Sequence, residues 1–170
     1  MALITLEDAE DDDVPNSFAD AAYFQAYAAK KVGGLDILTA AEAESSNKIE
    51  TALLNSVLFM NDEDWHGNVV DEDQPLAWYR RGVVRVNNGA AYYDQDVLPQ
   101  QVKDAQCELG LGLLDDEQLL DEIDAAGGLT RFEAGPLKME FKDGGQAQQA
   151  IRNYLRLTRG LVNRSGRTIR

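Results

Sequence analysis

The residues best able to do chemistry gather between positions 62 and 82, where two tryptophans, the only histidine and several carboxylates occur together. Five of them fit positions one, three, five, six and twelve of a calcium-binding loop: Asp62, Asp64, His66, Gly67 and Asp73. The ligand set suits calcium poorly, because imidazole is a soft ligand and position twelve lacks a bidentate glutamate. Pro75 also blocks the helix that should leave such a loop. We therefore expect no metal site.

Other catalytic chemistries find little support in the side chains available. One histidine and one cysteine cannot supply the three or four ligands that zinc usually takes. A catalytic triad would have to use His66, and no nucleophile motif surrounds any serine. Cys107 lies on an apolar helical pattern and is expected to be a small buried side chain, not a nucleophile. No phosphate-binding loop is present. We expect no catalytic residue and no cofactor.

The two tryptophans are more typical of a structural clamp than of a ligand site. Large aromatic side chains anchor irregular loops onto helices, so Trp65 and Trp78 are expected to be core residues. Gln74 and Arg80 can donate hydrogen bonds to loop carbonyls that have no secondary-structure partner. A ligand-binding aromatic pocket remains the alternative interpretation.

The elements that must position this segment are predicted to be mainly α-helical. We expect helices from Ser17 or Asp20 to about Gly33, from the Thr39–Glu42 capping box to Met60, from Pro99 to about Leu114, and along the apolar stripe from Ala147 to Val162. A short acidic helical segment is expected in residues 115–126. Turn signals at Asn88-Gly89 and Gly135-Pro136 predict hairpins. The fold class is a compact helical bundle of about four helices with one or two small β-hairpins and flexible charged termini.

Charge divides the chain into three parts within one domain-sized length of 170 residues. We expect an acidic flexible arm at 1–15, a helical core domain with hairpins at 16–145, and an amphipathic helix with a basic tail at 146–170. Residues 151–170 hold six arginines and no acid, and without them the first 150 residues carry a charge of −20. Such a body disfavours a broad nucleic-acid surface, and the opposed ends suggest pairing within one chain or between subunits. No apolar run is long enough to span a membrane.

The tryptophan segment also resembles a known signature. Its residues follow the order W-x-G…Q-x-L-x-W-P-R-x-G in Trp65, Gly67, Gln74, Leu76, Trp78, Arg80 and Gly82. This order is similar to that of small tailed-phage head–tail adaptor (head-completion, neck) proteins, many of which are labelled DnaT-like single-stranded-DNA-binding proteins. The stretches "NSFADAAYFQAY", "VLPQQVKDAQCELGLGLL" and "EAGPLKMEF" resemble the same family, so the likeness covers residues 16–142. Tyr79 stands where the family usually has proline, the N-terminal cap is shortened around Asp20, and the basic end is longer.

The resemblance implies a structural virion protein of the neck, made in the host cytoplasm and assembled as a dodecameric ring beneath the portal. Its implied partners are the portal protein, a tail, tail-terminator or nozzle protein, other copies of itself, and double-stranded DNA that passes without specific binding. An acidic wall suits that passage, because like charge removes the counterion release that drives DNA binding. The residues expected to contact the portal are Arg152, Arg156, Arg159, Leu161, Val162, Arg164, Arg167, Ile169 and Arg170.

The alternative function is single-stranded-DNA binding. The basic C-terminal tail would contact phosphates, while Trp65, Trp78, Tyr92 and Tyr93 would stack on bases.

Overall fold

The fold is mainly α-helical, as the sequence predicts. The computed structural model describes residues 3–5, 7, 14–45, 47–85, 91–117, 119 and 146–163. Within these residues the helices are α1 (Ala21–Ala28), α2 (Gly34–Glu44), α3 (Lys48–Asn61), α4 (Gln100–Asp115) and α7 (Gln146–Leu157). Two short strands, β1 (Asn68–Val69) and β2 (Arg80–Arg81), pair antiparallel with Val69 opposite Arg80.

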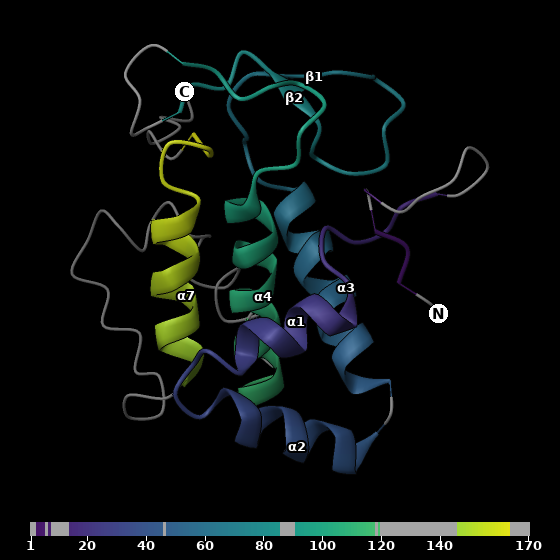
Figure 1. Cartoon of the computed structure of the whole chain (residues 1–170), viewed down its shortest axis with the longest axis vertical. Helices are drawn as coiled ribbons and strands as arrows, with labels where there is room; N and C mark the ends of the chain where they lie inside the picture. The colour runs from purple at the N-terminus through teal and green to yellow at the C-terminus, as the bar shows by residue number, and fades with distance from the viewer. Residues whose placement is uncertain are drawn as a thin grey trace, which may run out of the picture.

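Helix α4 runs through the centre of the molecule and contacts α1, α2, α3 and α7 (Figure 1). Because neighbours surround it, every residue from Ala105 to Leu113 is buried. Gly110 permits this packing, since a Cβ atom there would lie 3.2 Å from Cε2 of Phe24. Helix α2 lies at one end of the bundle, and the loops that carry β1 and β2 lie at the other (Figure 1).

Two apolar clusters form the core. The larger one joins the loop residues Trp65, Leu76 and Trp78 to α3, α4 and α7. The smaller one lies toward α2 and gathers around Phe24 of α1 and Leu53 of α3. Cys107 belongs to this second cluster and is fully buried, and burial raises the pKa of its thiol well above the usual value. Its position fits the structural role expected from the sequence.

Three predicted helices have other bounds in the structure. The predicted helix from Thr39 to Met60 is two helices, α2 and α3, and α7 ends at Leu157, before Val162. Asp20 caps α1 by accepting from the Tyr23 amide at 2.6 Å, but α1 ends at Ala28, before the glycine pair. The capping box at Thr39 is wrong: Thr39 lies inside α2, and its hydroxyl donates to the Leu35 carbonyl at 2.9 Å. Gly34 begins α2 because the chain turns tightly there; a Cβ atom at Gly34 would lie 2.3 Å from the Ala28 oxygen.

Several predicted features are described only in part. Six residues of the predicted N-terminal arm are described, and Ile4 and Glu7 among them contact the body: the Ile4 amide donates to Asn16 at 2.9 Å, and Glu7 pairs with Lys103. Val84 and Tyr92 form an antiparallel bridge, as the hairpin prediction requires, although the Asn88-Gly89 turn lies outside the described residues. The second hairpin, most of the acidic helical segment and residues 164–170 also lie outside them.

Candidate functional site

The tryptophans of the signature segment pack against each other inside the protein. Their ring centroids lie 5.6 Å apart in an edge-to-face arrangement, and Trp65 and Trp78 are only 4% and 0% exposed. The Trp65 indole N–H donates to the Met60 carbonyl at the end of α3 at 2.6 Å, and that of Trp78 donates to Val97 at 3.2 Å. The Trp78–Tyr79 peptide bond is cis. Each indole therefore ties the loop to a neighbouring element.

Arg80 holds the same loop from within through four backbone carbonyls. Its Nε donates to His66 at 2.8 Å, its Nη1 to Ala77 at 3.0 Å, and its Nη2 to Trp65 at 3.1 Å and Gly67 at 2.9 Å. Burial lowers the pKa of the guanidinium, and nearby Asp64 opposes that change. The planar fork of arginine suits four acceptors in different directions, which a lysine could not reach together.

The remaining signature residues also shape the loop. Gln74 donates to the Leu76 carbonyl at 2.6 Å, as expected from the sequence. Gly67 has φ of 73°, and a Cβ atom there would lie 2.4 Å from the Arg81 oxygen. Gly82 has φ of 78° with open space around it, so backbone conformation alone favours glycine there. We call these seven residues the tryptophan clamp: Trp65, Gly67, Gln74, Leu76, Trp78, Arg80 and Gly82.

The clamp leaves few exposed aromatic side chains for a nucleic acid. Neither indole ring is open to a base, so a DNA-binding site would have to use other residues. Tyr93 is half-buried, packs edge-to-face on Trp78 with centroids 6.3 Å apart, and donates its hydroxyl to Gln101. Tyr92, at 60% exposed, is the accessible member of the proposed stacking set.

The chain after α7 docks onto the clamp. The His66 amide donates to the Leu161 carbonyl at 2.8 Å, and the Asn163 amide donates to Asp64 at 2.6 Å. Leu161 and Val162 are 1% and 5% exposed, because both side chains pack in the larger apolar cluster, and their role as portal contacts stays a prediction. Deleting residues 161–170 would therefore remove part of the core.

The predicted basic residues fall into two groups. Arg152 and Arg156 on α7 and Arg159 in the following turn are exposed. The other portal-contact candidates lie outside the described residues: Arg164, Arg167, Ile169 and Arg170.

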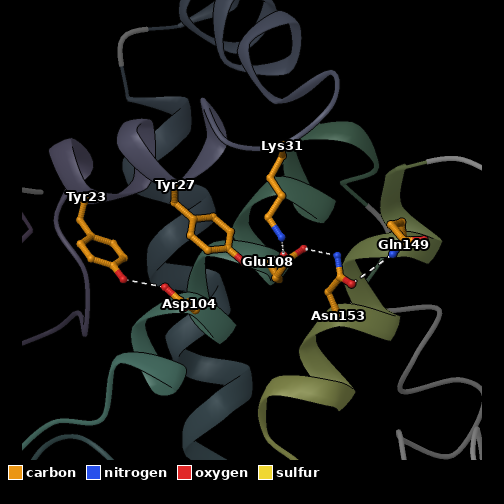
Figure 2. A network of polar contacts seen from close by, with 7 residues as sticks. All are labelled: Tyr23, Tyr27, Lys31, Asp104, Glu108, Gln149 and Asn153. Atoms are coloured by element: carbon orange, nitrogen blue, oxygen red, sulfur yellow. Dashed lines mark hydrogen bonds and ion pairs between the residues drawn. The ribbon is translucent and has the colours of Figure 1, made fainter.

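A buried polar network that the sequence analysis missed fixes α7 to the rest of the bundle (Figure 2). The Glu108 side chain is buried and accepts from the Tyr27 hydroxyl, the Lys31 ammonium and, at 3.0 Å, Asn153 of α7. Gln149 donates to Asn153 at 3.1 Å. Burial first, and then the bond to Glu108, raises the pKa of Tyr27 well above its usual range. The only signal in the sequence is a glutamate inside an apolar run.

A second buried polar residue joins α4 to the start of the chain. The Gln106 Oε1 accepts from the amides of Phe18 at 3.0 Å and Ala19 at 2.8 Å. Its Nε2 donates to Ser17 Oγ at 2.8 Å and to the Leu53 carbonyl at 3.0 Å. All of these groups are buried away from water, so Gln106 supplies the hydrogen-bond partners that the two amides and the carbonyl need.

The described residues contain no group of three histidine, cysteine or carboxylate side chains placed to share a metal ion. Within that same part of the chain, no helix is long and apolar enough to cross a membrane. An open pocket of ≈ 340 Å³ lies between α3 and the end of α4, where Lys48 pairs with Glu44 and Glu117.

The geometry defines a mainly α-helical protein whose signature loop is held from inside by paired indoles and an arginine. A family model described as "Putative DnaT-like ssDNA binding protein" matches the whole chain, residues 1–170, and the chain belongs to that family. No curated protein and no solved structure gives a match.

Proposed function

We propose that this protein is a non-catalytic head–tail adaptor, which forms a ring beneath a phage portal, extends the DNA channel and presents the tail attachment platform. The observation that carries the proposal is that the signature residues stabilise a loop of the protein itself. The side chains by which the chain resembles adaptors are engaged in holding its own loop, as a structural role requires. The family description names single-stranded-DNA binding and does not itself extend to an adaptor.

Charge supports the adaptor role over a strand-gripping role. A chain with a net charge of −14 offers little of the counterion release on which DNA affinity depends. A channel wall benefits from this property, because double-stranded DNA must pass without adhering. The implied partners are the portal, a tail or nozzle protein and further copies of the chain, and the implied location is the virion neck.

The test is assembly on DNA-filled heads that carry a portal but lack this protein. Purified full-length protein should add a ring of density beneath the portal in electron micrographs and should allow tails to join. A chain truncated after Asn163 keeps Leu161 and Val162 but removes Arg164, Arg167 and Arg170, so it should stay folded and lose head binding. Full-length protein that adds nothing to such heads would overturn the adaptor proposal.

Single-stranded-DNA binding is the second candidate, and the family description is the observation that favours it. It would rest on Arg152, Arg156, Arg159 and exposed Tyr92. Fluorescence anisotropy with labelled oligo(dT) over a salt series distinguishes the candidates. A strand-binding protein should show affinity whose logarithm falls with log salt by about 0.7 for each phosphate neutralised. An adaptor should show no saturable binding at physiological salt.

A further inference from the structure

Three exposed arginines follow one another along α7 and the turn after it, and we call them the arginine ridge: Arg152, Arg156 and Arg159. At about 1.5 Å of rise per residue, Arg152 and Arg156 lie about 6 Å apart along the helix axis, and Arg159 follows in the turn. None of the three forms an ion pair with another described residue. The opposite side of α7 is fixed, since Ile151 and Tyr154 are buried and Asn153 donates to Glu108 (Figure 2). The ridge is thus a rigid basic surface.

Three exposed carboxylates form a matching surface on the loop between β1 and β2, which we call the acidic loop: Asp71, Glu72 and Asp73. They likewise form no ion pair within the described part of the chain. The loop is held by local bonds, because Asp71 Oδ1 accepts from the Asp73 amide at 3.0 Å and Gln74 accepts from the Asp71 amide at 3.3 Å. Arg80 forms no ion pair with the acidic loop, and its guanidinium donates to backbone carbonyls instead.

The two surfaces lie on different sides of the molecule. Figure 1 shows α7 along one edge, while the loop that joins β1 to β2 extends over the opposite edge. A single copy therefore cannot bring its own ridge onto its own acidic loop without unfolding. Two copies can do so, since a guanidinium fork pairs well with carboxylates.

We propose that the arginine ridge of one copy binds the acidic loop of a second copy. The contact is head-to-tail, so an open chain of copies keeps one unused ridge at one end and one unused acidic loop at the other, until a ring closes or a filament grows. Single exposed ion pairs are weak, but ring closure engages both surfaces of every subunit at once. The inference rests on the proposed function in one respect: an adaptor ring needs two complementary surfaces on each subunit.

The experiment is sedimentation velocity on the full-length protein at low and at high salt. Wild-type protein should assemble at low ionic strength and dissociate at about 0.5 M salt, where the screening length falls to a few ångströms. The ridge variant R152E/R156E/R159E and the loop variant D71K/E72K/D73K should each remain monomeric. An equal mixture of the two should recover assembly, because the reversed ridge of one variant and the reversed loop of the other again carry opposite charges.

Matched controls separate assembly from folding and from net charge. D36K/E42K changes exposed acids on α2 and should assemble as the wild type does. Thermal melts should show that each variant is folded. If the ridge reversal does not fold, the neutral variant R152Q/R156Q/R159Q replaces it and should also be monomeric.

Several outcomes would overturn the inference. Wild-type protein that stays monomeric at about 100 μM in low salt, where exposed charge pairs are least screened, would rule out the contact. A ridge variant that assembles normally but loses oligo(dT) binding would assign the ridge to DNA. A ridge reversal that lowers the melting temperature, with wild-type protein monomeric, would assign the ridge to a contact within the chain.

The failure of this inference is distinguishable from failure of the adaptor proposal. If the chain joins portal-bearing heads but the ridge and loop reversals join them equally well, the adaptor stands and the inference fails. If the chain assembles through these surfaces but does not join heads, the inference stands and the adaptor fails.

Discussion

Replacing Trp78 with alanine tests the clamp most directly. The side chain is fully buried, packs edge-to-face on Trp65 and Tyr93, and bonds to the Val97 carbonyl. Emptying a buried large aromatic site costs about 3–5 kcal/mol, because the removed ring leaves a cavity that its neighbours fill only in part. For a chain of this size each kcal/mol lowers the melting temperature by roughly 2–4 °C, so W78A should melt roughly 6–20 °C lower.

The assay is urea unfolding followed by circular dichroism, with a thermal melt as a second measurement. Trp78→Phe should lose less, about 1–2 kcal/mol, because it keeps an aromatic ring and gives up the indole N–H bond and some volume. Tyr92→Ala is the surface control and should change stability by less than about 0.5 kcal/mol, since its side chain is 60% exposed. If W78A unfolds at the same urea concentration as this control, the clamp does not stabilise the domain and its assignment fails.

Three further predictions concern the polar side chains. Arg80→Lys should lower the free energy of unfolding by about 2–3 kcal/mol in urea, because half-buried carbonyls lose charged donors; Arg81→Lys, at an exposed neighbour, is the control, and equal effects would refute the role of Arg80. Gln106→Leu should cost about 2–4 kcal/mol in the same assay by leaving buried amides unsatisfied, whereas Gln95→Leu on the surface should not. Because the folded state raises the pKa of Tyr27, stability should be fully present below pH 10 and fall above it, where the unfolded chain ionises more readily. Tyr27→Phe should flatten that fall in alkaline unfolding curves, and an unchanged slope would contradict this origin.

Local signals in the sequence predicted the elements well where local chemistry decides them. Pro99 precedes α4, Asp20 caps α1, and apolar spacing places Ile151 and Tyr154 on the buried face of α7. The capping box at Thr39 failed for a physical reason. A threonine inside a helix satisfies its hydroxyl on the carbonyl four residues back, so the same residue type fits both positions.

The long-range polar contacts could not be read from the sequence. Gln106 reaches amides 87 and 88 positions away, and Glu108 reaches Lys31 77 positions away. In sequence each resembles a surface residue on an amphipathic helix, because only the packing of α1 and α7 around α4 removes the water from them. The docking of Leu161 and Val162 was missed for a related reason, since the chain leaves its helix, turns at Gly160 with φ of 79°, and pairs with a distant loop.

Arginine has two different uses in this protein, and the difference depends on what lies within reach of the guanidinium. The Arg80 guanidinium lies inside the loop although no carboxylate is bonded to it, because four carbonyl oxygens of this irregular loop need hydrogen-bond donors. Burial lowers its pKa, yet arginine keeps its charge where a lysine would more readily lose one. Arg152, Arg156 and Arg159 are exposed instead, and none of them forms an ion pair with another described residue. The acceptors that suit an exposed guanidinium are carboxylates or phosphates, which another molecule can supply. The donors of the guanidinium group thus stabilise a loop at Arg80, and at the arginine ridge they are available to another subunit or to DNA. Substitutions in the ridge therefore distinguish assembly from DNA binding.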